Sequence, residues 1–334
     1  MMEGFPPIQK RLMEFIRREL RPGYNHYNVS KLIGDASARQ YFRYTSDARQ
    51  SFILAAYPEA FDPEHFPYQQ IYSLLKEIGL PVAEIFALDG PLGIVLQEDL
   101  GDETLQKHFL DATHGRRQEL LNRAIDSLIR LQQEGSSRFG PQYDAFGLAF
   151  DEEKLNWELG FFARHYLHNY RRLPVAGEAA LLEEFGRLAA ELAGARRVLC
   201  HRDYHIRNLM LKDGRLYMID FQDARWGPTS YDLVSLLKDS IELGGEEIDR
   251  HIEYFLAHSR LTESPEAFSR RQFDLMSVQR LLKALGTYAY QVVVRENFIY
   301  EQYMAGSLHR VLLSLQAMPE FPCLQSVVES ELNR

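Results

Sequence analysis

The sequence predicts an α+β protein, with a small N-terminal antiparallel sheet lobe carrying one helix and a larger, mainly helical C-terminal lobe. The first hundred residues contain short apolar segments of β character separated by turn residues. After Gly101 the apolar residues recur at helical spacing, apart from one short β-rich stretch. A chain of 334 residues is long enough for two packed lobes. We therefore expect lobes at 1–100 and 101–334, with a hinge near 97–101.

The N-terminal lobe is predicted to form a five-stranded antiparallel sheet. A helix at 8–20 precedes it, and an internal helix at 65–78 is ended by Gly79 and Pro81. The strands are expected at 27–33, 40–45, 51–57, 84–88 and 92–97.

The C-terminal lobe is predicted to be helical around a β-rich stretch. Its strands are expected at 198–200, 208–211 and 215–219. Its helices are expected at 104–110, 116–133, 152–170, 177–193, 229–241, 246–258, 268–290 and 300–316.

Composition narrows the functional class. The net charge of −9, from 38 basic and 47 acidic side chains, disfavours nucleic acid and anionic membranes as partners. The two cysteines form neither a disulfide framework nor a zinc motif. The first twenty residues are charged and amphipathic, unlike a secretory signal, and no stretch of about 18 apolar residues occurs. We expect a cytoplasmic protein that acts on a small molecule; its oligomeric state is not indicated.

The β-rich stretch carries the strongest chemical signal, Cys-His-Arg-Asp-Tyr-His-Ile-Arg-Asn at 200–208, with Ile-Asp-Phe-Gln-Asp at 219–223. Phosphoryl transfer needs a carboxylate that orients the attacking hydroxyl, and oxygen ligands for the metal that bridges the phosphates. Asp203 meets the first need, and Asn208 with Asp220 meets the second. A hairpin over 209–219 is expected to return Asp220 beside Asn208.

These segments resemble the His-x-Asp-x-x-x-x-Asn catalytic loop and the Asp-Phe-x-Asp metal segment of the aminoglycoside phosphotransferase/choline kinase family. The resemblance covers essentially the whole chain and implies a protein-kinase-like fold, with ATP and Mg²⁺ as cofactors. It implies that Asp203 is the catalytic base and that Asn208 and Asp220 bind Mg²⁺. His201 would brace the loop. We predict His205 near the transferred phosphate, with a purely structural role as the alternative.

The segment 34–43, Gly-Asp-Ala-Ser-Ala-Arg-Gln-Tyr-Phe-Arg, is predicted to be the turn that covers the nucleotide. Its small residues allow backbone N–H groups to approach phosphates, and it is not a Walker loop. A simple turn is the alternative. Adenine is expected at the hinge. The predicted nucleotide-binding residues are Gly34, Ser37, Arg39 and Arg43 of this turn with Glu98 and Leu100 of the hinge.

The Gly-Asp-Ala-Ser start also resembles one branch of the family, the kinases that phosphorylate N-acetylmuramate and N-acetylglucosamine at the anomeric C1 hydroxyl. The segments 97–102, 220–224 and 231–237 agree with that branch in order and spacing. The resemblance implies a role in cell-wall sugar recycling. An aminoglycoside, choline or homoserine kinase is the alternative within the enzyme class.

One departure concerns the lysine that protein-kinase-like enzymes usually carry on the third strand. No lysine occurs between Lys31 and Lys76. We expect Arg39 or Arg43 to supply the charge. A non-catalytic nucleotide-binding pseudokinase is the alternative of another class, although the intact acids speak against it. A protein kinase is disfavoured because eight residues between Asp223 and Asp232 are too few for a peptide-docking segment.

Two further interpretations concern the C-terminal lobe. Asp232 is expected to be a structural acid buried at a helix terminus. The aromatic residues of 157–162 are expected to belong to the core rather than to an acceptor pocket.

Overall fold

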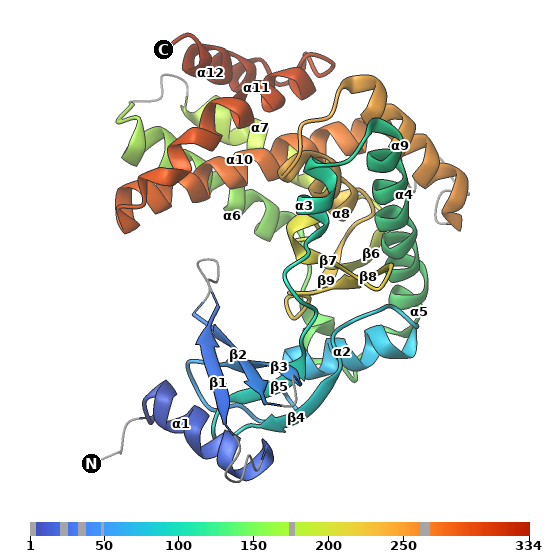
Figure 1. The fold of residues 1–334 in the computed structure, drawn as a ribbon. Coiled ribbons are helices and arrows are strands. Elements are labelled where there is room, and N and C mark those ends of the chain that lie inside the picture. The colour runs from blue at the N-terminus through green and yellow to red at the C-terminus, as the bar shows by residue number, and fades with distance from the viewer. Residues whose placement is uncertain (1–4, 21–25, 33–37, 48–49, 174–177, 261–267) are drawn as a thin grey trace. The chain divides into compact units, whose positions relative to one another are not determined.

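The computed structural model describes residues 5–20, 26–32, 38–47, 50–173, 178–260 and 268–334 (Figure 1). The chain forms two compact units. The first comprises Met1–Arg117 and Arg207–Asp223, and the second comprises Gln118–Ile206 and Ala224–Arg334. A segment from the middle of the chain therefore belongs to the first unit, while the predicted lobe boundary near residue 100 stays a prediction.

The first unit is built on the predicted five-stranded antiparallel sheet, whose strand order is β1-β2-β3-β5-β4. The strands are β1 Tyr27–Lys31, β2 Gln40–Ser46, β3 Ser51–Ala56, β4 Ile85–Asp89 and β5 Ile94–Glu98. Helix α1, Ile8–Phe15, continues as a π-helical turn to Leu20 and buries its apolar face against this sheet. Helix α2, Pro67–Glu77, begins with proline, whose fixed φ suits the first helical position.

A small hairpin completes the first unit. Strands β7, Leu209–Lys212, and β8, Arg215–Met218, pair as predicted. Asp213 and Gly214 join them with φ of +49° and +71°, as a two-residue hairpin turn requires. Backbone N–H groups of Met218 and Leu211 donate to the carbonyls of Pro81, at 2.9 Å, and Glu103, at 2.8 Å, just before helix α3, Leu105–Leu110. These bonds attach the hairpin to the N-terminal part of the chain.

The second unit is mainly helical and is organised around the long helix α10, Arg270–Arg295 (orange in Figure 1). Helix α4, His114–Arg130, belongs to this unit from Gln118 onward. The other helices are α5 Ser136–Arg138, α6 Glu152–Phe162, α7 Glu178–Ala193, α8 Tyr231–Val234, α9 Gly245–His258, α11 Met304–Leu315 and α12 Pro322–Leu332. Helix α10 packs against α6, α7 and α11. A Cβ added at Gly286 would lie 2.9 Å from Phe162 Cα, so this glycine allows α10 to approach α6 closely.

Three features of the second unit differ from the sequence expectation. Strand β9, Arg225–Pro228, pairs with β6, Arg197–Cys200, although its four residues lack an apolar alternation. Helix α12 was not predicted. The helix expected at 229–241 is α8 followed by a π-helical turn at Ser235–Asp239. Among the described residues no helix is long and apolar enough to cross a membrane.

Candidate active site

The loop that contains Asp203 follows β6 and is anchored by a buried carboxylate at the start of α8. Asp232 has no exposed surface. Its Oδ2 accepts a hydrogen bond from His201 N at 2.6 Å, and its Oδ1 accepts one from Arg202 N at 3.0 Å. The expected structural acid is therefore present, and it fixes the two peptides that precede Asp203.

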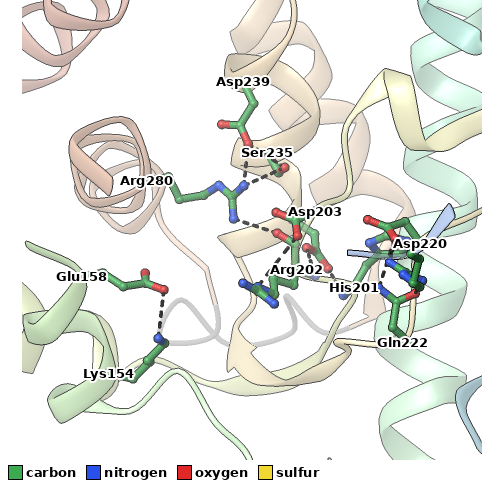
Figure 2. A network of polar contacts seen from close by, with 12 residues as sticks. Lys154, Glu158, His201, Arg202, Asp203, Asp220, Gln222, Ser235, Asp239 and Arg280 are labelled. Atoms are coloured by element: carbon green, nitrogen blue, oxygen red, sulfur yellow. Dashed lines mark hydrogen bonds and ion pairs between the residues drawn. The ribbon is translucent and has the colours of Figure 1, made fainter. Parts of the chain in front are cut away.

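The backbone is strained in two of the segments that carry candidate catalytic or metal-binding residues. Arg202 adopts a φ of +87° and Asp220 a φ of +63°, values that residues with a side chain rarely take. Such strain persists only where the surroundings enforce it. The peptide N–H of Arg202 donates to Asp232. The carbonyl of Arg202 accepts a hydrogen bond from Arg280 Nη1 at 3.0 Å (Figure 2).

Arg280 of α10 was not identified by sequence reasoning. Its side chain is buried, and its Nη2 donates to Asp239 Oδ2 at 2.5 Å and to Ser235 Oγ at 3.0 Å. The guanidinium lies 4.3 Å from the centre of the Tyr231 ring. A lone arginine within the buried stretch 273–282 of a long helix was the only available signal.

The charge of Asp203 is set by residues of the second unit. Partial burial acts to raise the pKa of its carboxyl, but the positive charges of Lys283, Arg280, Arg202 and His205 outweigh this and hold the pKa at about 2. Asp203 is therefore ionised at neutral pH. An ionised carboxylate can accept a hydrogen bond from a hydroxyl group and orient it for attack.

The two histidines of the loop differ in their surroundings. His201 is buried, with its ring 5.6 Å from that of Tyr204. The Tyr204 hydroxyl in turn donates to the Ala124 carbonyl at 2.7 Å. His205 N donates to the Asp203 carbonyl at 3.0 Å, which closes a tight turn. The role of the His205 side chain beside the transferred phosphate stays a prediction.

The candidate metal ligands lie in the first unit at the open end of the β7–β8 hairpin. Ile219 N donates to the Asn208 carbonyl at 3.1 Å. Asp220 is the next residue after Ile219, so this hydrogen bond brings its backbone close to Asn208. The Asp220 side chain is 37% exposed. In the described part of the chain no group of three or more His, Cys, Asp or Glu side chains is placed to hold a metal. Two oxygen ligands nevertheless fit Mg²⁺, which keeps several waters and also takes phosphate oxygens.

Arg39, just before β2, contacts the same carboxylate. Its Nη2 lies 2.6 Å from Asp220 Oδ1, and its Nη1 donates to Gln222 Oε1 at 2.9 Å. The guanidinium is 6.0 Å from the ring centre of Tyr41 and 5.8 Å from that of Tyr57. Arg39 thus places a positive charge beside Asp220, near two tyrosine rings, and its role in place of the third-strand lysine stays a prediction.

Arg43 is used differently. It forms ion pairs with Asp99 at 2.7 Å and with Asp102 at 2.8 Å, and Asp99 also accepts a hydrogen bond from Ser51 Oγ at 2.5 Å. These contacts join β2 and β3 to the segment after β5. The structure thus separates the two arginines that the sequence could not distinguish.

The predicted hinge residues are well ordered by contacts within the first unit. Glu98 Oε1 accepts a hydrogen bond from Lys212 Nζ at 2.6 Å, so the Glu98 side chain is an ion-pair partner, and its predicted contact with the nucleotide stays a prediction. Leu100 packs with Ala83 and Met210 in a small apolar cluster. Gly34 and Ser37 lie outside the described residues.

The aromatic residues of α6 divide between core and surface. Phe162 is fully buried, as expected, whereas Trp157 is 54% exposed. Lys154 Nζ lies 4.2 Å from the Trp157 ring centre. The expectation of a core role is therefore correct for Phe162 and wrong for Trp157, because a helix on the surface of a unit presents one side of its aromatic stretch to solvent.

Comparisons with known proteins define the class. Residues 28–268 match the phosphotransferase enzyme family. A choline/ethanolamine kinase family protein from Mesorhizobium loti shares the fold, with a TM-score of 0.62, 13% identity and coverage of 96% of this chain and 99% of that one. The choline kinase LicA from Streptococcus pneumoniae does so with a TM-score of 0.59, 16% identity and coverage of 96% and 99%. The chain belongs to the phosphotransferase enzyme family and has the protein-kinase-like fold.

The relatives with higher sequence identity to this chain share one name. The N-acetylmuramate/N-acetylglucosamine kinase of Pseudomonas aeruginosa is 35% identical over 266 residues, which cover 76% of this chain and 74% of that protein. The enzyme of the same name from Neisseria meningitidis serogroup B is 32% identical over 272 residues, which cover 79% and 78%.

The anchoring role of Asp232 predicts the effect of an isosteric change. In Asp232→Asn one carboxylate oxygen becomes an amide NH₂ group. That group faces one of the two backbone N–H donors and cannot accept its hydrogen bond. We expect the free energy of unfolding to fall by about 2 kcal/mol, and we expect kcat to fall because the loop loses its anchor. Asp151→Asn is the matched control, because Asp151 caps α6 through Lys154 N and asparagine caps helices equally well.

Thermal unfolding followed by circular dichroism, together with steady-state kinetics, measures both effects. An Asp232→Asn protein with the stability and kcat of the wild type would contradict the assignment.

Proposed function

We propose that the protein transfers the γ-phosphoryl group of ATP to the anomeric C1 hydroxyl of an N-acetylated amino sugar, N-acetylmuramate or N-acetylglucosamine. The observation that carries the proposal is the ionised Asp203 on its anchored loop, in a chain whose closer relatives are kinases of these two sugars. Because ATP is available in the cytoplasm, the proposal includes a cytoplasmic location.

In this proposal Asp203 accepts a hydrogen bond from the C1 hydroxyl and turns its oxygen toward the phosphorus. A new bond forms between the sugar oxygen and phosphorus while the bond between phosphorus and the ADP oxygen breaks. The hydroxyl proton passes to Asp203. A carboxylate whose pKa is about 2 is a weak base, so the proton moves late, after the oxygen has begun to bond. The product is a sugar 1-phosphate.

Asn208 and Asp220 are the residues proposed to hold Mg²⁺. Bound Mg²⁺ supplies positive charge to the phosphates. Only four residues separate Asp203 from Asn208 in the sequence, so one short segment carries both the proposed base and a proposed ligand. The apolar cluster around Leu100 is the proposed support for adenine, beside Glu98.

Arg39 is the proposed replacement for the missing strand lysine. It is 2.6 Å from Asp220, so its charge lies where phosphates bridged to a metal on Asp220 would bind. Arg43 has both of its acidic partners within 3.0 Å and is proposed to be structural. With the charge supplied by Arg39, the missing lysine does not require an inactive protein, and the pseudokinase alternative is therefore disfavoured.

The direct test is ATP consumption with Mg²⁺ against N-acetylmuramate, N-acetylglucosamine, choline and an aminoglycoside. We expect turnover of the two sugars only, with the 1-phosphate identified by phosphorus NMR. Asp203→Ala should lower kcat by about 10²- to 10⁴-fold because the hydroxyl is no longer oriented or deprotonated. Turnover of choline or the aminoglycoside instead of the sugars would overturn the acceptor assignment, and full activity of Asp203→Ala would overturn the role of that residue.

The two arginines give a second prediction. Arg39→Gln should raise the KM for ATP by about tenfold to a hundredfold, since one charged hydrogen bond to phosphate is lost. Arg43→Gln is the control of the same residue type, and its KM for ATP should change by less than the Arg39 variant. The measurement is initial rate against ATP concentration at saturating sugar. The assignment fails if Arg39→Gln binds ATP as the wild type does.

A further inference from the structure

Lys283 is a cation near Asp203 to which the mechanism proposed above gives no contact with either substrate. Lys283 lies on α10, three residues after Arg280, so both project from neighbouring positions on one side of the helix. Of the positive charges that act on the Asp203 carboxyl, that of Lys283 is the strongest.

Lys283 is placed by its neighbours on α10. Gln279, one helical turn earlier, donates from Nε2 to Glu158 Oε2 of α6 at 2.9 Å. Glu158 is itself almost fully buried. Arg280, three residues before Lys283, donates to the Arg202 carbonyl at 3.0 Å, so Lys283 lies on the side of α10 that faces α6 and the Asp203 loop. The charges that act on its ammonium group are those of Glu158, Asp203, Arg280 and Arg202. Burial lowers its pKa from the ordinary value.

The other charges of this region are already occupied. Arg280 is paired with Asp239 at 2.5 Å, and Arg202 Nε lies 3.8 Å from Asp203 Oδ2. Glu158 accepts from Gln279 and has Lys154 Nζ at 3.7 Å. Lys283, by contrast, makes no side-chain hydrogen bond and no ion pair below 4 Å with any residue in the described part of the chain. A partly buried ammonium group without such a contact is suited to an anion that arrives with the substrate.

We propose that Lys283 binds a carboxylate on the acceptor and thereby selects N-acetylmuramate over uncharged amino sugars. This inference rests on the function proposed above. N-acetylmuramate is N-acetylglucosamine with a lactyl ether on O3, and that lactyl group carries a carboxylate. In the sugar ring only C2 lies between C1, whose hydroxyl is placed at Asp203, and C3, which bears the lactyl group. A lysine close to Asp203 is therefore within reach of the carboxylate.

The same placement disfavours cationic acceptors. Choline and aminoglycosides carry a positive charge, and a like charge beside the reacting hydroxyl would weaken their binding. A site with Lys283 beside the reacting hydroxyl therefore differs in charge from an acceptor site that binds amines.

The test compares three acceptors that differ in charge and bulk: N-acetylmuramate, its neutral methyl ester, and N-acetylglucosamine. The kcat/KM of each is measured at saturating Mg-ATP and pH 7.5, where Asp203 stays ionised even if its pKa rises. The proteins are the wild type, Lys283→Gln, Lys283→Arg and Lys154→Gln. The last is the control, because it removes a different lysine that also lies near Glu158.

We expect Lys283→Gln to lower kcat/KM for N-acetylmuramate by about tenfold to a hundredfold, as loss of one charged hydrogen bond implies. Its kcat/KM for the methyl ester and for N-acetylglucosamine should stay close to wild type. Lys283→Arg should keep most of the preference, and Lys154→Gln should keep all of it.

Two results would overturn the inference while leaving the proposed function intact. The first is an equal loss with all three acceptors, which would place Lys283 in phosphoryl transfer or in folding. The second is an unchanged preference in Lys283→Gln. A wild type that phosphorylates none of the three sugars would instead overturn the proposed function and the inference with it.

Discussion

The carboxylate of Asp203 sits where burial opposes its charge, and the cations around it favour its ionised form. Burial alone would raise its pKa, yet Lys283, Arg280, Arg202 and His205 hold it at about 2. Two of these cations come from α10, which approaches α6 closely because Gly286 has no side chain. Helix packing in the second unit is thereby coupled to the ionisation of one loop residue.

The loop is held in part by Arg280, one of the cations that lower the pKa of Asp203. Asp232 takes the two peptide N–H groups before Asp203, and Arg280 takes the Arg202 carbonyl. These bonds enforce the left-handed conformation of Arg202. Arg280 therefore contributes both position and charge, and a change there would disturb two properties at once. In the first unit, Asp220 is strained in the same way and is paired with Arg39.

The local part of this site could be predicted from sequence and the long-range part could not. Asp203, Asn208 and Asp220 stand at fixed short spacings, and Asp213-Gly214 is a strong hairpin signal. Arg280 and Lys283 lie about eighty residues further on, within a helix whose periodicity indicates burial but not partners. Arg39 and Arg43 flank one turn, and only the ion pairs distinguish them. Strand β9 lacked the alternation that identifies strands.

The most direct test of this account is the pKa of Asp203 itself. Carbon-13 NMR of protein labelled at the aspartate carboxyl carbons, with Asp203→Asn to identify the resonance, follows its titration. The account predicts a carboxylate that stays ionised down to about pH 3, well below the midpoint of an ordinary aspartate. A midpoint at or above 3.8 would show that the surrounding cations do not outweigh burial, and the proposed electrostatic design would be wrong.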